Sequence, residues 1–353
     1  MPVHVSRPQV VLPDHKVTTD DIVHDISLHH PDHPRLGAIH RVVRNCGVNT
    51  RYFTRPLDAS TVSGTAGIDR RAEAAFDDAV VMATEAARRA LTAAGLAAPG
   101  DDGYADIDAI VTTHSTGWSV PNLDVALLGP LRLRPTVRRV ALTTLACAGG
   151  TQALIRAADL VAARPGSKVL VVAAEVISSV YNHADTGIES MIYKALFGDS
   201  AAAAVVSSEP LGPGLVVQDS FEYVLPDSVE RYSGRIAADG FHFDSTKAAL
   251  SAADDVLPAL RTWLRGRSAD FAVIHPGSLR IIADTATAVG LSGDDARHST
   301  DTLADEGNLG GVSVLRVLER THTAPPPGGA EGLVVAYGPG FAAAALHCRW
   351  QDA

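Results

Sequence analysis

The sequence predicts an α/β protein built from two similar halves. Strand-like and helix-like segments alternate along most of the chain, which is the order that α/β sheets require. A turn with two glycines followed by an apolar helical segment occurs twice. CAGGTQALIR from residue 147 aligns with NLGGVSVLRV from residue 308. FGDSAAAAVV from residue 197 likewise resembles YGPGFAAAALH from residue 337. We therefore expect a duplicated unit, with halves at residues 1–208 and 209–353.

In the first half, helices and strands are predicted only after about residue 70. The first 70 or so residues are rich in His, Pro and Asp and are expected to be irregular. An amphipathic helix covers AEAAFDDAVVMATEAARRALTAAG and ends at Gly95. Strands are expected at DAIVTTHS, RRVALTTLAC and SKVLVVAAEV, with the helix TQALIRAADLVAA between the last two. GDSAAAAVVSSE ends this half.

The turn residues PLGPG separate the second half from the first. A helix is expected at DDVLPALRTWLRGR, a strand at DFAVIHPG and a second helix at GGVSVLRVLERT. GLVVAYGPGFAAAALHCRW reads as a strand, a glycine turn and a second strand. This order repeats the end of the first half.

The composition excludes several classes of protein. The 353 residues are 46% hydrophobic and 20% charged, as in a globular protein with a large core. The net charge of −10 argues against nucleic-acid binding, because phosphate contacts need a basic surface. No unbroken apolar run of about 18 residues and no signal-peptide segment is present. We therefore predict a cytoplasmic protein that has no membrane contact.

The cysteines and the histidine-rich run give no clear metal signal. Cys46, Cys147 and Cys348 are widely spaced and odd in number, so neither a disulfide framework nor a zinc site is predicted. The run HHPDHP at 29–34 contains possible ligands. Prolines interrupt it and no second ligand cluster accompanies it, so we interpret it as a polar loop and expect no bound metal.

Cys147 is the candidate nucleophile. It lies where a predicted strand ends and a helix begins, and Gly149 and Gly150 allow the backbone to turn tightly there. Free N–H groups and the helix dipole at such a position lower the pKa of a thiol and can bind an oxyanion. The alternative is a small buried hydrophobic residue, which is the usual role of a free cysteine.

Two further residues could act with this thiol. His275 follows the apolar strand FAVI and precedes Pro-Gly, so its ring is expected at the carboxyl end of a strand, as a general base. His114 and His242 are other candidates with less distinctive neighbours. Asn308 opens a helix after Gly307 and could be an ordinary N-cap. Its place in the repeat, opposite Cys147, suggests an amide donor facing the same reacting atoms.

Five motifs resemble, in order and spacing, the type III polyketide synthases, which form the chalcone and stilbene synthase-like family. They are LACAGG around Cys147, LFGDSAAA at 196–203, IHPGS at 274–278, EGNLGG at 306–311 and YGPGF at 337–341. TGWSVPNLD at 116–124 and RYFTRP at 51–56 are most similar to bacterial members such as the tetrahydroxynaphthalene synthases. The resemblance implies an acyltransferase with a thiolase-like fold, a duplicated αβαβα sandwich.

The resemblance also implies a mechanism. Cys147 anchors the acyl chain, and His275 and Asn308 complete a catalytic triad. A thiolate–imidazolium pair of Cys147 and His275 attacks a starter acyl-CoA. Malonyl-CoA loses CO2, and donors from His275 and Asn308 hold the enolate without a cofactor or metal. The extended chain returns to CoA for another round and is finally cyclised to a small aromatic or pyrone product.

Substrate-binding positions follow from the same resemblance. Phe197 and Phe243 match gatekeeper phenylalanines, Gly234 matches a cavity-lining glycine, and Gly338, Pro339 and Gly340 match a turn that shapes the floor of the site. Tyr193 replaces a residue that is usually glycine, and Ser115 and Val180 stand where threonines are common. These changes imply a smaller or redirected starter pocket.

The substrate and subunit contacts are also implied by the family. Arg41, beside His40 and Arg44, aligns with a basic residue that contacts CoA, although an ordinary solvated helix face is the alternative. The family pattern implies a homodimer. Val120 takes the place of a methionine that reaches across the dimer interface in plant members.

Two competing functions share parts of this pattern. A β-ketoacyl-ACP synthase III would also use Cys, His and Asn, but the GPG turn and the GNLGG motif favour a polyketide synthase. A catalytically silent partner of the same fold is disfavoured by the intact Cys147, His275 and Asn308. Cavity shape determines the starter unit, the number of extensions and the cyclisation, so the sequence leaves these open.

Overall fold

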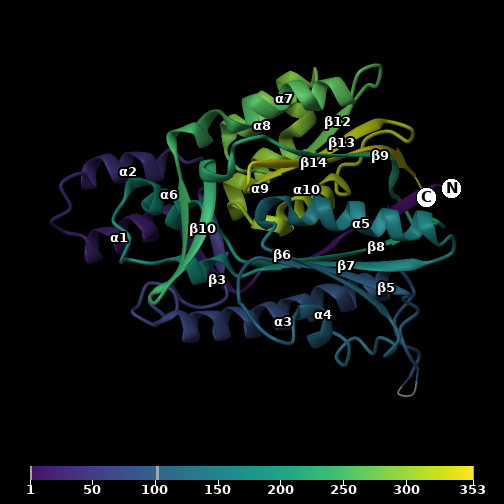
Figure 1. Ribbon diagram of the computed structural model, residues 1–353, viewed down its shortest axis with the longest axis horizontal. Coiled ribbons are helices and arrows are strands. Elements are labelled where there is room, and N and C mark those ends of the chain that lie inside the picture. Colours follow the sequence, from purple (N-terminus) through teal and green to yellow (C-terminus); the bar gives the residue numbers. More distant parts are fainter. Residues whose placement is uncertain (1, 101–102, 353) are drawn as a thin grey trace.

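The computed structural model describes residues 2–100 and 103–352 and consists of alternating layers of helices and strands (Figure 1). A ten-stranded sheet has the order β12-β13-β14-β9-β1-β8-β7-β5-β6, and β2 pairs with β8. Its strands are β1 (Val3–Ser6), β2 (Gln9–Val11), β5 (Ala109–His114), β6 (Arg138–Thr143), β7 (Lys168–Glu175), β8 (Ser200–Ser207), β9 (Gly214–Val224), β12 (Phe271–Ile274), β13 (Glu331–Gly338) and β14 (Ala342–Gln351).

The predicted duplication is visible in the strand pairing. In the first half β5 runs parallel to β7, which is antiparallel to β8. In the second half β12 runs parallel to β13, which is antiparallel to β14. The helix α5 (Gly149–Ala163) precedes β7, and α10 (Ser313–Thr321) holds the matching place before β13. β1 pairs with both β8 and β9 and so joins the halves, while the boundary at residue 208 stays a prediction.

The hydrophobic core is divided by these layers. The largest buried cluster surrounds α5 and α10 and includes Leu154, Leu315 and the inner faces of both half-sheets. A second cluster lies under α3 (Ile68–Ala93), whose buried face is largely alanine. A third packs α7 (Ala252–Trp263), α8 (Leu279–Ala288) and α9 (Arg297–Glu306) on the other half-sheet. The predicted αβαβα sandwich is confirmed, with α5 and α10 as its central helices.

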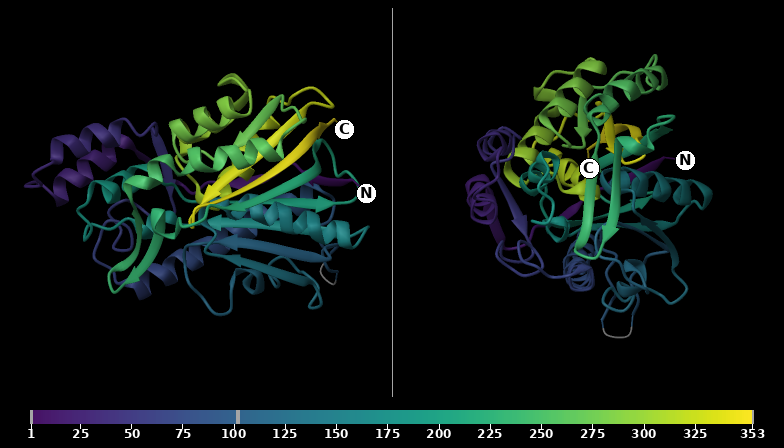
Figure 2. Two further views of the ribbon diagram at one scale, coloured as in Figure 1. Left: turned by 45° about the horizontal axis from the view of Figure 1, so that its top comes forward. Right: turned by 60° about the vertical axis from the view of Figure 1, so that its left-hand side comes forward.

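The expectation that the first 70 residues are irregular is wrong. They contain β1, β2, a β3–β4 pair (His15–Thr18 with Thr50–Phe53), α1 (Thr19–His29) and α2 (Leu36–Arg44). Thr18 and Asp21 form a capping box that starts α1, and Ile22 and Ile26 bury one face of it. These elements are short, so the periodic spacing of their hydrophobic residues is too weak to predict them from the sequence. Figure 2 shows α1 and α2 at the opposite end of the molecule from both chain termini.

The helices and strands predicted from residue 70 onward are present. Several more were not predicted: α4 (Leu123–Ala126), α6 (Ile188–Leu196), α8, α9, β9 and the hairpin of β10 (Tyr232–Ala237) and β11 (Gly240–Ser245). Short 3-10 turns, at Ala146–Ala148, Ile177–Val180 and Gly310–Val312, lie near the glycine motifs. Within the described ranges, no helix has the length and apolar character needed to cross a membrane.

Asp199, which directly precedes β8, joins three segments of the chain. Its buried carboxylate accepts hydrogen bonds from the Thr54 N–H (2.9 Å), the Ser178 N–H (2.7 Å) and the Ser178 hydroxyl (2.6 Å). Burial raises the pKa of Asp199 to about 6 despite these donors. The Asp199→Ala variant would leave two backbone donors buried and unpaired.

We therefore expect Asp199→Ala to lower the free energy of unfolding by about 3 kcal/mol or more, measured by chemical denaturation at pH 8. Asp301→Ala, at an exposed position of α9, is the matched control and should change it by less than about 0.5 kcal/mol. Equal stabilities for the two variants would contradict the assigned role of Asp199.

Candidate active site

The two duplicated glycine turns touch each other at the centre of the molecule. A Cβ on Gly150 would lie 2.2 Å from the Gly311 carbonyl oxygen, and a Cβ on Gly311 would lie 3.0 Å from the Ala146 oxygen. Only glycine permits this approach of two backbones. The turn that carries Cys147 and the turn that carries Asn308 therefore meet, as the sequence repeat predicts.

Cys147 lies in the 3-10 turn Ala146–Ala148, two residues before α5 begins. Ala146 has a φ of 46°, and its N–H donates to the Ser115 hydroxyl at 2.8 Å. On the other side, Gly338 packs so tightly that an added Cβ would lie 2.8 Å from the Ala148 side chain. Gly338 thus packs directly against the turn that carries Cys147.

The Asn308 amide is held in one orientation. Its Oδ1 accepts the Gly310 N–H at 2.9 Å, and its backbone N–H donates to the Leu196 carbonyl at 2.8 Å. The Cys147 sulfur lies 3.9 Å from both the amide nitrogen Nδ2, which can donate to it, and the amide oxygen Oδ1, to which the thiol can donate. The expectation that Asn308 is a helix N-cap is wrong, because Leu309 and Val312 hold the N-cap positions of the 3-10 turn and of α10. The Asn308 side chain instead closes a tight turn through the Gly310 N–H and lies next to the thiol.

His275 extends strand β12 toward the same point. The backbone N–H of His275 donates to the Val335 carbonyl at 2.8 Å, and the side chain is buried. Nδ1 is buried and has no hydrogen-bond partner among the described residues. His275 lines one cavity together with Cys147 and Asn308, so side chains from both halves converge there.

Burial shifts both titrating groups away from their charged forms. It raises the pKa of Cys147 to about 12, and the neighbouring Glu175 carboxyl acts in the same direction. It lowers the pKa of His275 to about 3. The lowered thiol pKa expected from the helix terminus is therefore not found. Transfer of the Cys147 proton to His275 would create both charges together, and their attraction in a dry cavity offsets the burial.

This proton transfer predicts how Cys147 reacts with iodoacetamide. In His275→Ala the thiol has no base, so its alkylation rate should rise about tenfold per pH unit between pH 6 and 9, as for a thiol far below its pKa. In wild-type protein the alkylation rate should be higher at pH 7 than in His275→Ala, and it should change less with pH. Intact-mass measurement of the alkylated fraction over time gives both rates, and identical profiles would contradict the pairing.

The cavity has a volume of about 350 Å³ and a mainly apolar lining. Helix α6 and the residues after it contribute one wall, and the Gly338-Pro339 turn contributes the floor. The lining residues are Cys147, Glu189, Ile192, Tyr193, Leu196, Phe197, Tyr232, Ser245, Thr246, Ala249, His275, Gly277, Ile281, Asn308, Tyr337, Gly338, Pro339 and Phe341. Seven of the predicted site residues are in this set.

Six predicted site residues lie outside the lining: Ser115, Val180, Gly234, Phe243, Gly340 and Arg41. Ser115 lies next to the turn that carries Cys147, where its hydroxyl accepts the Ala146 N–H. Phe243 packs behind the wall, with its ring centroid 5.9 Å from that of Phe197. Gly234 pairs with Phe243 across the β10–β11 hairpin. Val180 and Gly340 do not line the cavity, and Arg41 is exposed on α2.

Tyr232 is a lining residue that was not predicted. Its ring stacks on Phe243 and meets Tyr193 edge-on at 6.1 Å. Burial and the nearby Cys147 raise the pKa of its hydroxyl well above the usual value. Tyr232 precedes Gly234 by two positions on β10, so the alternation of a strand places both on one face. The two-residue spacing from Gly234 was therefore the sequence feature from which Tyr232 could have been predicted as a lining residue.

The competing histidines and cysteines have other roles. His114 is hydrogen-bonded to Asn122 and the Thr116 carbonyl, and His242 pairs with Asp185 and Asp239. Cys348 is buried in β14 and donates to the Gly332 carbonyl at 3.3 Å. None of these residues lines the cavity.

The fold and the site together define a condensing enzyme with a thiolase-like fold, and comparison with known proteins narrows this class. Residues 29–210 match the family described as chalcone and stilbene synthases, N-terminal domain. The chain is 32% identical to 1,3,6,8-tetrahydroxynaphthalene synthase of Streptomyces coelicolor over 99% of this chain and 92% of that one. It is 30% identical to phloroglucinol synthase of Pseudomonas fluorescens, with 97% and 98% covered.

Solved structures agree with the sequence matches. The germicidin synthase of Streptomyces coelicolor, a type III polyketide synthase, superposes with a TM-score of 0.93 at 29% identity, covering 99% of this chain and all of that one. The chain therefore belongs to the chalcone and stilbene synthase family. It is a bacterial type III polyketide synthase, an acyltransferase that makes small aromatic or pyrone products from acyl-CoA and malonyl-CoA.

Proposed function

We propose that Cys147 carries the growing acyl chain and that His275 and Asn308 act on it directly. The observation that carries this proposal is the convergence of these three residues from the two halves on one apolar cavity. His275 accepts the Cys147 proton as the sulfur attacks the starter thioester. It then returns that proton to the departing CoA thiolate, so loading leaves His275 neutral.

The extension step uses the same donors. The carboxylate of malonyl-CoA leaves as CO2, and the electron pair of the broken C–C bond forms an enolate. Asn308 Nδ2, fixed through the Gly310 N–H, and a neutral His275 donate to the enolate oxygen. The low pKa of His275 keeps the imidazole neutral for this role. The enolate carbon attacks the acyl carbonyl on Cys147, and the sulfur leaves as thiolate.

Small acyl starters, or malonyl-CoA itself, suit the cavity best. Its volume is about 350 Å³, and Tyr193, Phe197 and Tyr232 fill one side of it with aromatic rings. The relatives that make tetrahydroxynaphthalene and phloroglucinol are consistent with small aromatic products. The Tyr193 ring occupies space that a glycine would leave to the substrate.

Product analysis tests this assignment. Purified protein is mixed with malonyl-CoA, alone and with acyl-CoA starters of increasing length, and products are identified by mass spectrometry. We expect aromatic or pyrone products from malonyl-CoA and short starters, without carrier protein. Strict dependence on malonyl-ACP would instead indicate a β-ketoacyl-ACP synthase III. Absence of both product and acyl adduct would indicate a catalytically silent protein.

CoA is expected to enter beside the end of α2. Arg41 and Arg44 lie in the last turn of this helix. Shortly after it, Gly47 lies against the Leu279 side chain at the start of α8, and α8 also carries the lining residue Ile281. These contacts support a position near the cavity rim for exposed Arg41, whereas Arg44 pairs with Asp20 at 3.2 Å. Arg41 is thus the better partner for a CoA phosphate.

A homodimer would cover the apolar loop that follows β5. Trp118 and Val120 are 72% and 80% exposed there, and the adjacent β6 is an edge strand with several exposed residues. We expect light scattering to give about twice the 36.9 kDa chain mass. Joint replacement Trp118→Glu and Val120→Glu should halve it, whereas Val81→Glu, an exposed valine on α3, should not. A monomeric wild type would refute the dimer.

A further inference from the structure

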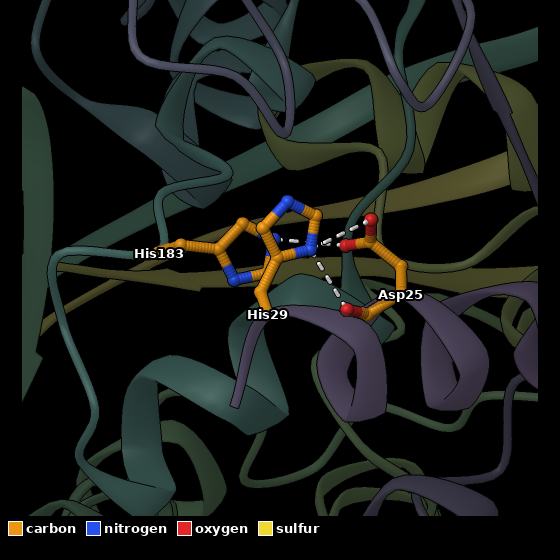
Figure 3. A group of neighbouring side chains, drawn as sticks. All are labelled: Asp25, His29 and His183. Carbon is orange, nitrogen blue, oxygen red and sulfur yellow. Dashed lines mark hydrogen bonds and ion pairs between the residues drawn. The ribbon is translucent and has the colours of Figure 1, made fainter. Parts of the chain in front are cut away.

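A cluster of possible metal ligands lies outside the active site. Asp25 and His29 are one turn apart on α1, and His183 comes from the segment between Ile177–Val180 and α6. One ligand atom from each residue lies within 4.8 Å of the others. Figure 3 shows both imidazoles beside the Asp25 carboxylate, with interactions joining all three side chains.

The spacing of these atoms is close to that of a metal site. His29 Nδ1 lies 3.3 Å from Asp25 Oδ1, and His183 Nε2 lies 2.9 Å from Asp25 Oδ2. His29 Nδ1 is also 2.9 Å from the Asp25 backbone carbonyl, a hydrogen bond that a bound metal ion would replace. Four ligands at 2.0–2.1 Å around a tetrahedral zinc ion lie roughly 3.4 Å apart. The His29 and His183 rings are stacked with centroids 3.9 Å apart, so binding requires them to tilt, because each nitrogen binds metal in its ring plane.

Surrounding groups orient the ligands as in known metal sites. The Ser63 hydroxyl donates to Asp25 Oδ1 at 2.9 Å, and the Tyr181 hydroxyl donates to Oδ2 at 2.5 Å. His183 Nδ1 is 2.9 Å from His30 Nε2, which leaves Nε2 of His183 facing the carboxylate. Metal-binding histidines typically use their second nitrogen in such a hydrogen bond.

The site is sheltered but open on one side. The Asp25 and His183 side chains are about one-tenth exposed, whereas the His29 side chain is 35% exposed. An ion can therefore enter past His29, and the same ring has room to tilt. Two imidazoles and one carboxylate leave a coordination position for water, and this mixture of ligands suits zinc and other divalent transition metals.

We propose that Asp25, His29 and His183 bind one divalent transition-metal ion, with zinc the best fit, and that His30 orients His183 from outside. The ion ties α1 to the segment that leads into α6, the helix that carries the cavity residues Tyr193 and Leu196. It is a structural tie, remote from the reacting atoms. The run HHPDHP predicted only a polar loop, because prolines interrupt it and no second ligand cluster accompanies it in the sequence. Asp25 lies outside the run and His183 is distant in sequence, so the fold alone brings them to His29.

The competing explanation is a hydrogen-bonded cluster that needs no metal, and metal binding to the full chain separates the two. Protein without an affinity tag is freed of metal with a chelator and titrated with Zn²⁺ by calorimetry. Co²⁺ replaces zinc in a parallel titration, because its visible spectrum reports coordination by nitrogen. The variants are His29→Gln, His183→Gln and His30→Phe. His24→Gln, exposed on the same helix, is the matched control.

We expect about one Zn²⁺ per wild-type chain and a higher melting temperature with Zn²⁺ than with chelator. His30→Phe should weaken binding about ten- to a hundredfold, and each ligand variant should weaken it more. The His24→Gln variant should match wild type. Melting curves in chelator identify any variant that fails to fold, and exposed His29 is the substitution least able to cause this. No zinc binding by wild type, or equal binding by His29→Gln and wild type, would overturn the proposal.

Discussion

Replacing Cys147 with alanine is expected to abolish product formation while leaving malonyl-CoA decarboxylation measurable. Chain extension requires a thioester on the Cys147 sulfur, so the loss should reach about four orders of magnitude or more. Decarboxylation needs only donors to the enolate oxygen, and Asn308 keeps its orientation through the Gly310 N–H without the thiol. Product is measured by mass spectrometry, and released CO2 or acetyl-CoA is measured separately.

Two matched variants separate the roles of the triad. Asn308→Ala should reduce both decarboxylation and product formation, because it removes a donor to the enolate. Cys46→Ala removes a cysteine that does not line the cavity and should retain both activities. Intact-mass analysis after incubation with an acyl-CoA should find an adduct in wild type and in Cys46→Ala, but none in Cys147→Ala. Product from Cys147→Ala would disprove the assigned nucleophile.

The centre of the site could be predicted from the sequence because backbone packing constrains it. Gly150 and Gly311 touch through atoms that leave no room for a side chain, so both copies of the repeat retain glycine there. Aligning these glycines placed Asn308 opposite Cys147 before any contact was known. His275 was predicted for a similar reason, since it directly follows a buried strand of recognisable pattern.

The surroundings of the site could not be predicted in the same way, because they depend on contacts between distant segments. His183 reaches Asp25 across 158 positions of the chain, and neither residue alone suggests a ligand. The pKa of Cys147 follows burial more than its helix terminus, and sequence position cannot measure burial. The short α1 and α2 were missed because their stability depends on packing against α6 and its neighbours.

Removing the Tyr193 ring is expected to change which starter the enzyme accepts. Tyr193 lines the cavity, with its ring 5.7 Å from Phe197 and 6.1 Å from Tyr232. Tyr193→Ala should enlarge the cavity, so longer acyl chains would fit where the ring now excludes them. We expect kcat/KM for a medium-chain starter relative to acetyl-CoA to rise about tenfold or more, since each methylene accommodated contributes about 1–3 kcal/mol.

The Tyr193→Phe variant distinguishes the volume of this residue from its hydroxyl group. Burial raises the pKa of Tyr193, and hydrogen bonding to Ser245 opposes this shift, so the hydroxyl has a partner that phenylalanine would lose. The ring volume is retained in Tyr193→Phe, so starter preference should stay as in wild type if volume sets it. If Tyr193→Phe shifted the preference as far as Tyr193→Ala does, the hydroxyl contacts would be the determinant. If neither variant shifted it, the wall formed by Phe197 and Tyr232 would set the limit on chain length.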